Sequence, residues 1–248
     1  MAALQEPVSL EDIEKNKPVL EDMAVSIMAH MAEMSVSEIS EILGISSQLA
    51  IKAHNLAYEF PHKFTGYNAL KAFIGDAYRG LDVASMSKDS LKWVDEDLRI
   101  ISSVYGILKP SDIIKPYRCE FNKQIAPGHK TPIQVFKSKI TVNLVNYIKE
   151  NKITDIIDLL PGDADKCVDW KIVRAFTKVH KILIQEEGPA GKLKTPIAKT
   201  LKESRGRMCR EILENKIQTF SDLCSFDSSH FIYSPEYSKP GLPVFLIA

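Results

Sequence analysis

The stretch from residue 97 to residue 121 constrains the fold most, because glycine and proline divide a strongly apolar run there. Apolar residues recur at three- and four-residue steps, as they do on one face of an amphipathic helix that begins after Ser87 as N-cap. They are Leu91, Val94, Leu98, Ile101 and Tyr105. Gly106 can take the left-handed conformation that ends a helix, and Pro110 prevents the same helix from resuming. The pattern therefore predicts one helix that ends at Gly106.

A second, shorter helix is predicted just after that glycine. Residues 110–114 fit one or two helical turns, which Pro116 would stop. Helix, glycine corner and short helix would together form a helix-hairpin-helix near 88–116. Exposed amides at such a corner, with nearby cations, can grip a phosphate. The corner residues are Gly106, Ile107 and Leu108, and the cations are Lys109, Lys115 and Arg118.

Three motifs in this region carry a resemblance to a known family. The segment 73–81 reads Phe-x-Gly-Asp-x-Tyr-x-Gly-Leu. Tyr-Gly-x-Leu-x-Pro-x-Asp follows at 105–112, and Pro-Tyr-Arg-x-Glu at 116–120. In these motifs the chain resembles the YaaA family of peroxide-stress-response proteins. The resemblance can be followed from about residue 16 to residue 216, and it is strongest between residues 72 and 121.

The resemblance implies a mixed α/β domain of the kind called a cantaloupe fold, with a helix-hairpin-helix beside a positive cleft. It also implies sequence-independent binding of duplex or branched DNA, and a role in limiting damage from peroxide and free iron. The chain departs from the family where a Ser-Pro-Ala-Lys-Thr motif is expected near the N-terminus, because nothing in residues 1–18 matches it. Any role of that lysine is open for this chain.

Composition predicts a soluble protein whose polyanion site, if present, is local. The 248 residues are 45% hydrophobic and 26% charged, and 32 Lys and Arg balance 32 Asp and Glu, so no global charge attracts nucleic acid. We expect a polar N-terminal arm at 1–18 and one α/β (α+β) domain at 19–248, a mixed sheet flanked by helices. Four cysteines lie far apart without a Cys-x-x-Cys pair, which indicates reduced thiols in the cytoplasm and no metal or cofactor. No apolar run is long enough for a membrane span.

Positive charge is concentrated between residues 192 and 213. This segment matches the family pattern Lys-x-x-Arg-Gly-x-Met from Lys202 to Met208. Helical spacing places Arg205 on the apolar face, where a guanidinium is costly unless it is paired. Its partner would be an internal carboxylate or a bound anion, and the carboxylates considered are Asp76, Asp112 and Glu120. On the other faces, Lys199, Lys202 and Arg207 would be solvated or would bind nucleic-acid backbone.

An enzyme of unassigned reaction is the alternative function. An apolar run at 69–74 predicts a strand whose end carries Asp76, either as a ligand-facing residue or as a simple turn or helix cap. Asp76, Arg118, Glu120 and Arg205 could then line a pocket for a small anionic, nucleotide-like substrate. No Walker loop, Gly-x-Gly-x-x-Gly or nucleophile elbow names a reaction. A helix-turn-helix at 38–54 is disfavoured, because its second helix offers no arginines to DNA.

Overall fold

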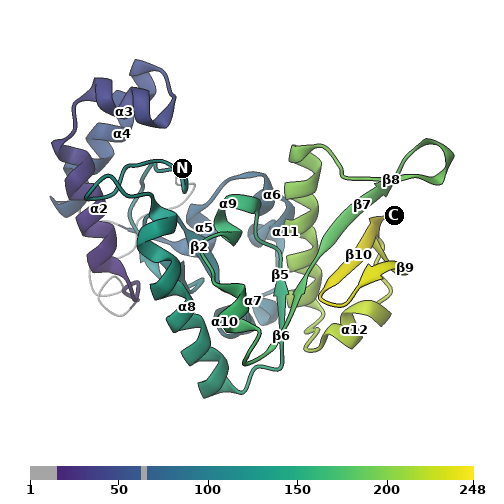
Figure 1. Cartoon of the computed structure of the whole chain (residues 1–248). Coiled ribbons are helices and arrows are strands. Elements are labelled where there is room, and N and C mark those ends of the chain that lie inside the picture. The colour runs from purple at the N-terminus through teal and green to yellow at the C-terminus, as the bar shows by residue number, and fades with distance from the viewer. Residues whose placement is uncertain (1–15, 63–65) are drawn as a thin grey trace. The chain divides into compact units, whose positions relative to one another are not determined.

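The computed structural model describes residues 16–62 and 66–248, and it confirms the predicted mixed α/β class (Figure 1). The chain divides into two compact units, each built from three segments. Unit 1 contains the chain up to Phe73, Leu98–Asn143 and Gly162–Asp169; unit 2 contains Ile74–Asp97, Leu144–Pro161 and Trp170–Ala248. The predicted arm at 1–18 falls almost entirely outside the described residues. The single-domain boundary at residue 19 stays a prediction.

Unit 1 begins with three helices between residues 21 and 59. They are α2 (Glu21–Glu33), α3 (Val36–Leu43) and α4 (Ser47–Glu59). The capping box that starts α3 is present, since Ser35 Oγ accepts from the Glu38 amide at 3.2 Å and the Glu38 carboxylate accepts from the Ser35 amide at 2.7 Å. Helix α4 buries only alanines, at positions 50, 53 and 57. Such small side chains let α2 and α4 pack closely.

The predicted helix-hairpin-helix is not confirmed. Helix α7 (Lys88–Asp97) ends well before Gly106, and β2 (Ile100–Ser102) pairs antiparallel with β3 (Gly106–Leu108). The Ser102 hydroxyl accepts from the amides at 104 and 105, which offers the backbone an alternative to helix. Gly106 does adopt a positive φ of 72°, but it closes a β-hairpin instead of a helix.

The segment after Pro110 is also extended instead of helical. Strand β4 (Ile113–Ile114) pairs antiparallel with β1 (Tyr67–Asn68), so the predicted second helix is wrong. The Asp112 carboxylate accepts from the Lys109 amide at 2.8 Å and thereby fixes the turn that leads into β4. The strand predicted at 69–74 is wrong as well, because Ala69–Ala72 forms the short helix α5.

Unit 2 is organised by a four-stranded sheet of order β8-β7-β10-β9. Its strands are β7 (Leu183–Glu187), β8 (Leu193–Lys194), β9 (Phe231–Lys239) and β10 (Leu242–Ile247). Strand β10 runs parallel to β7 and antiparallel to β9. A separate parallel pair joins β5 (Asp155–Asp158) to β6 (Lys178–Lys181). The apolar core packs these strands against α11 (Ala198–Glu214) and α12 (Phe220–Ser225), through Met208 and Leu223.

Two glycines allow an unusually close contact between α11 and α6 (Asp76–Leu81). A Cβ added to Gly80 would lie 2.0 Å from the Glu203 carbonyl oxygen, and one added to Gly206 would lie 1.8 Å from the Ala77 carbonyl oxygen. Both glycines belong to the sequence motifs quoted above. The contact explains why these positions need glycine, because any side chain there would force the two helices apart.

Candidate functional site

The predicted DNA-binding corner of unit 1 is buried. Gly106, Ile107 and Leu108 form a fully buried strand, so the expectation of an exposed corner at these residues is wrong. Lys109 is exposed, but Lys115 is half-buried. Its ammonium donates to the Phe60 carbonyl oxygen at 2.8 Å and lies 5.1 Å from the centre of the Phe60 ring. Burial lowers the pKa of Lys115, and these contacts indicate a structural role.

Arg118, a predicted site residue in unit 1, has a guanidinium N–H that lacks a hydrogen-bond partner in the part of the chain that the structure describes. Its Nε is buried and has no hydrogen-bond partner among the described residues. The neighbouring Tyr117 is buried and shares a hydrogen bond of 2.8 Å with the Ser102 hydroxyl, and burial raises the pKa of Tyr117 to about 12. Glu120 is exposed. A buried N–H without a partner is uncommon, so an anion beside Arg118 would satisfy it.

The unit 2 candidates lie on α6 and α11, where most cations are paired. Asp76 lies in the first turn of α6 and forms an ion pair with Arg79. This position agrees with the simpler of its two predicted roles, that of a residue at the start of a helix. Lys199 lies 3.9 Å from Glu203. Arg205 is half-buried, as its predicted inward position requires. Of the catalytic candidates, unit 2 holds Asp76 and Arg205, and unit 1 holds Arg118 and Glu120.

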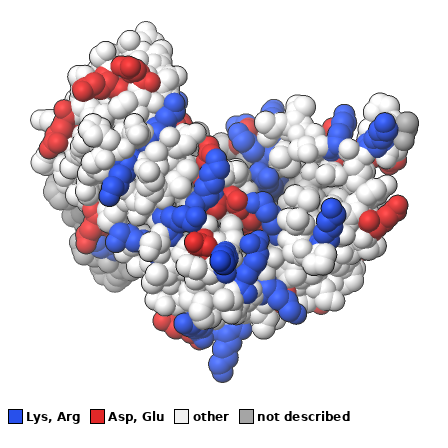
Figure 2. Space-filling view, in the orientation of Figure 1, with Lys and Arg blue, Asp and Glu red and all other residues white. Residues whose placement is uncertain are grey.

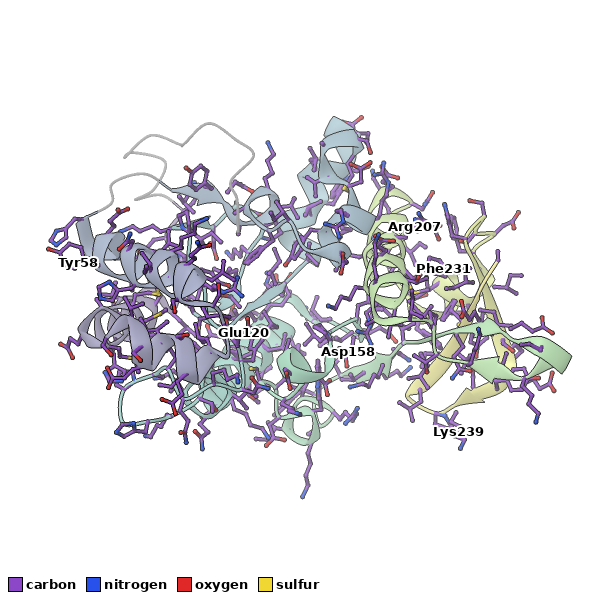
Figure 3. All side chains as sticks on the ribbon, turned by 90° about the horizontal axis from the view of Figure 1, so that it is seen from above. Tyr58, Glu120, Asp158, Arg207, Phe231 and Lys239 are labelled. Atoms are coloured by element: carbon purple, nitrogen blue, oxygen red, sulfur yellow. The ribbon has the colours of Figure 1, made fainter. Side chains whose placement is uncertain are left out.

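The hydrogen bonds and the ion pair of Arg210 give this side chain a structural role. Its guanidinium donates to the carbonyl oxygens of Leu81 and Asp82, at 3.3 and 2.9 Å, and its Nη2 lies 2.9 Å from the Glu214 carboxylate. These contacts fasten the end of α6 to α11. By contrast, Lys202 and Arg207 are exposed, and neither forms an ion pair with any residue that the structure describes. Arg207 is labelled on α11 in Figure 3. The basic helix therefore keeps two free cations, which are five positions apart and point to different faces.

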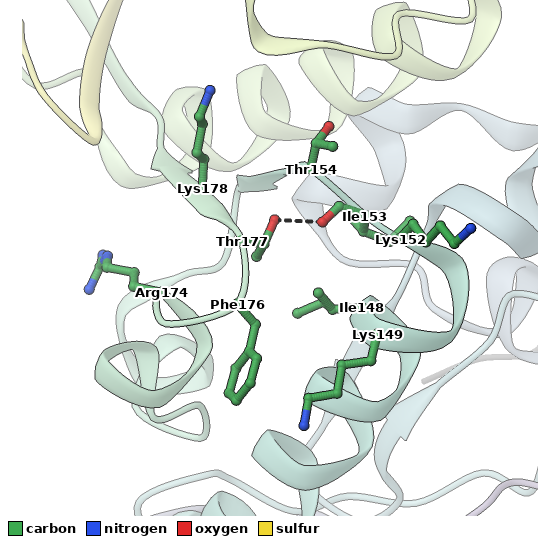
Figure 4. A pocket seen from close by; sticks show the side chains of 9 residues that line it. All are labelled: Ile148, Lys149, Lys152, Ile153, Thr154, Arg174, Phe176, Thr177 and Lys178. Carbon is green, nitrogen blue, oxygen red and sulfur yellow. Dashed lines mark hydrogen bonds between the residues drawn. The ribbon is translucent and has the colours of Figure 1, made fainter.

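A basic depression in unit 2 was not predicted from the sequence (Figure 4). Its volume is about 590 Å³, and no acidic residue lines it. The lining residues are Ile148, Lys149, Lys152, Ile153, Thr154, Arg174, Phe176, Thr177 and Lys178. All four cations are exposed, and none forms an ion pair within residues 16–62 and 66–248. Figure 2 shows basic side chains projecting at the lower end of the view, where α8 ends in Figure 1.

The depression lies where helices α8 and α10 end and strands β5 and β6 begin. Helix α8 (Pro132–Asn151) terminates with Lys152 at a positive φ of 54°, and the Ile153 amide donates to the Ile148 carbonyl oxygen at 3.0 Å. This bond pattern is a Schellman stop. On the other side, α10 (Trp170–Val173) leads through Arg174 into β6. The Thr177 hydroxyl donates to the Ile153 carbonyl oxygen at 2.9 Å and joins the two sides.

The nearest carboxylate in the strand register is already engaged. Asp155 lies opposite Lys178, and it accepts from His180 at 2.8 Å and from the Thr154 hydroxyl at 2.9 Å. Burial would raise the pKa of Asp155, but these hydrogen bonds outweigh burial and lower it, with a smaller contribution from Lys178. The carboxylate is thus occupied by its own strand pair, and the cations of the depression face solvent.

Helix polarity accounts for only part of this arrangement. Cations near a helix C-terminus complement its partial negative charge, which suits Lys149 and Lys152 at the end of α8. Arg174 and Lys178 are outside that helix, and they add like charge to the same depression. Like charges placed together without counter-charges repel one another, so a bound polyanion would relieve the cost. The arrangement is therefore suited to binding phosphates.

A short sequence signal for the depression existed. Lys149-x-x-Lys152 precedes β5, and Arg174-x-Phe-x-Lys178 leads into β6. Parallel pairing of β5 with β6 brings the two segments together. Within the described part of the chain, no three His, Cys, Asp or Glu side chains are grouped as metal ligands would be. None of the described helices is long and apolar enough to cross a membrane.

Comparison with known proteins gives matches over nearly the whole chain. The model of the family described as "Peroxide stress protein YaaA" matches residues 3–237. A UPF0246 protein of Shewanella woodyi is 31% identical over 234 residues, 92% of this chain and 89% of that protein. A UPF0246 protein of Clostridium perfringens is 30% identical, covering 94% of this chain and 92% of its own length. A UPF0246 protein of Francisella tularensis subsp. novicida is 29% identical, covering 97% and 94%.

Proposed function

Because the chain belongs to the peroxide stress protein YaaA family, we propose that it binds DNA without sequence preference and so limits peroxide damage. The single observation that carries this proposal is the basic depression of unit 2. Four exposed cations line it, and none of its lining residues is acidic. A neutral protein has no global attraction for DNA, so a local surface of this kind must supply the affinity.

Binding would operate through the sugar-phosphate backbone. Lysine and arginine that neutralise phosphates release condensed counterions, which supplies most of a sequence-independent affinity. Lys152, Arg174 and Lys178 would contact phosphates directly. The exposed Lys109, Lys202 and Arg207 remain proposed contacts at other places on the surface. Lys115 and Lys199 are weaker candidates, because one is bound to a carbonyl and the other lies beside Glu203.

The thiols offer little support for the other obvious chemistry, direct reaction with peroxide. Thiolates react and thiols do not, so a reactive cysteine needs a low pKa. Burial raises the pKa of Cys119, Cys167 and Cys209 to about 12. The pKa of Cys224 is also raised, again by burial. Protection by occupying DNA therefore fits this chain better than protection by thiol oxidation.

Fluorescence anisotropy with a labelled 20-base-pair duplex at low salt tests the proposal. We expect Lys152→Glu/Arg174→Glu to weaken binding about tenfold or more, because two phosphate contacts become repulsive. The matched control is Lys137→Glu/Lys139→Glu, which makes the same charge change at two exposed positions of α8 outside the depression. Equal loss in both variants, or no binding by the wild type at low salt, would contradict the proposal.

Binding of a small anionic substrate beside Arg118 is the second candidate function. Its support is the buried Nε without a hydrogen-bond partner. Arg118→Lys keeps the charge but removes the planar donor. Saturable binding of inorganic phosphate or a nucleotide, measured by calorimetry and lost in Arg118→Lys, is the expected result. Heat of binding that is unchanged in the variant would contradict this role.

A further inference from the structure

We propose that the basic depression holds single-stranded DNA, with Phe176 as the surface on which a base stacks. This inference rests on the proposed function and adds the form of nucleic acid that the same site prefers. Phe176 lines the depression among the four cations and is 44% exposed. A cationic groove that also presents an aromatic ring is the arrangement by which proteins hold single strands.

Single-stranded and duplex DNA differ in whether their bases can stack on the Phe176 ring. In a duplex the bases are stacked on one another, so a protein ring at the surface reaches only phosphates and sugars. In a single strand the base faces are open, and each can stack on an aromatic side chain. Phe176 can therefore add affinity only for the unpaired form. The cations would serve both forms, since phosphates are present in each.

The surroundings of the ring fit this role. The Lys149 ammonium lies 4.4 Å from the centre of the Phe176 ring, so a cation and an aromatic face are already combined at one wall (Figure 4). The bond from Thr177 Oγ1 to the Ile153 carbonyl oxygen holds the segment that carries Phe176 against the end of α8. The volume of about 590 Å³ lies within the range of roughly 300–1,000 Å³ that accommodates small ligands, so a base with its flanking phosphates would fit.

Charge complementarity favours a strand over a single nucleotide. Four cations without lining carboxylates surround the depression, and several successive phosphates would neutralise them better than the phosphate of one nucleotide. An isolated exposed phenylalanine is ordinary on a protein surface, and alone it would carry no inference. Here it lines a depression that has four cations and no acidic lining residue, and the two observations point to the same ligand.

The test uses a labelled oligothymidylate of 12 nucleotides and a duplex of the same length, titrated with the full chain. We expect Phe176→Ala to weaken binding of the single strand about tenfold and to change duplex binding less than twofold. Phe176→Trp should keep the affinity. Its added fluorescence should be quenched by the single strand beyond any change in the wild type, which has two tryptophans. Tyr58→Ala, at another exposed aromatic residue, is the control and should change neither affinity.

Each alternative outcome has one meaning. If the wild type binds neither DNA at low salt, the proposed function itself fails. If both are bound and Lys152→Glu/Arg174→Glu weakens both while Phe176→Ala changes neither, the proposed function stands and the stacking inference is wrong. If thymidine monophosphate competes as strongly per molecule as the oligonucleotide, the site takes a nucleotide and the inference of a strand is overturned.

Discussion

Helix α11 and the basic depression both concentrate positive charge, but they use it in opposite ways. On α11, Arg210 is bound to the end of α6 and Lys199 lies beside Glu203. In the depression, Lys152, Arg174 and Lys178 have no ion pairs among the described residues. The denser run in the sequence is thus largely structural. The sparser pair of segments supplies four cations that have no ion pairs among the described residues, whereas α11 supplies two, Lys202 and Arg207.

This difference shows that the number of cations in a segment does not identify an anion site. A segment can bind an anion only if its cations are not already paired with carboxylates or hydrogen-bonded to carbonyl oxygens of the fold. Helix α11 carries its own acidic residues and packs tightly on α6 through Gly80 and Gly206. The depression collects its cations where two helices end, and Asp155, which lies opposite Lys178 in the strand register, is held by His180.

The largest expected difference concerns thiol reactivity on the two surfaces. Burial raises the pKa of Cys209, on α11, to about 12, whereas a cysteine at exposed Thr154 would sit among cations that favour its thiolate. At pH 7.5 we expect Thr154→Cys to react with iodoacetamide about a thousandfold faster than Cys209. Below pH 12 the Cys209 rate should rise tenfold per pH unit. Mass spectrometry of timed samples measures both rates, and comparable rates would contradict the assignment of α11 as a packed surface.

The next effect is on stability at the α6–α11 contact. Gly206→Ala would gain about 1 kcal/mol of helix propensity, but the new Cβ would meet the Ala77 carbonyl oxygen at 1.8 Å. We expect a net loss of about 2 kcal/mol or more, seen as a lower urea midpoint. Gly162→Ala is the control, because no atom lies within 4 Å of its added Cβ. Equal midpoints for the two variants would show that the helices do not meet as closely as described.

Replacing Arg210 should destabilise the fold more than replacing Arg207, because Arg210 is bonded within the described part of the fold and Arg207 is not. Arg210→Met leaves the carbonyl oxygens of Leu81 and Asp82 without their donor, which should cost about 1–3 kcal/mol in the free energy of unfolding. Arg207→Met, at an exposed position, should change it by less than about 0.5 kcal/mol. Both are measured by urea denaturation. The opposite order would mean that the roles of the two arginines are reversed.

The smallest expected effect extends the comparison to unit 1. Lys115→Met should lower the free energy of unfolding by about 1 kcal/mol, because the hydrogen bond to the Phe60 carbonyl oxygen is lost. Lys109→Met should leave the free energy of unfolding almost unchanged, and urea denaturation measures both. Burial lowers the pKa of Lys115 below 10.5, so the unfolded chain holds that proton more tightly than the folded chain. Wild-type stability relative to Lys115→Met should therefore improve as pH rises through the lowered pKa towards 10.5. A difference that is constant with pH would argue against a buried ammonium.

Local signals predicted much of the fold. The pattern Ser35-x-x-Glu38 is typical of a capping box and starts α3, and the apolar runs at 154–160 and 244–247 are typical of strands and contain β5 and part of β10. The failure at 98–108 has a physical cause. Apolar residues spaced for a helix there also fit a hairpin, and the decision depends on the Ser102 hydroxyl and on pairing with β3, which periodicity does not record.

The candidate site was harder to predict than the fold. The motif cations were found, but the sequence does not reveal that Lys115 would bind a carbonyl or that Arg210 would fasten α6. The depression depends on pairing between strands more than twenty residues apart. No short window of sequence contains all four of its cations. Only the fold distinguishes satisfied cations from unsatisfied ones.

The most direct test of the central claim is the salt dependence of duplex binding in two matched double variants. Lys152→Ala/Arg174→Ala removes unpaired cations of the depression, whereas Lys194→Ala/Lys199→Ala removes lysines that lie 3.2 and 3.9 Å from carboxylates. We predict that the slope of log affinity against log salt falls by about 1.8 in the first variant, roughly 0.9 for each lost phosphate contact, and stays unchanged in the second. A fall confined to the second variant would contradict the account.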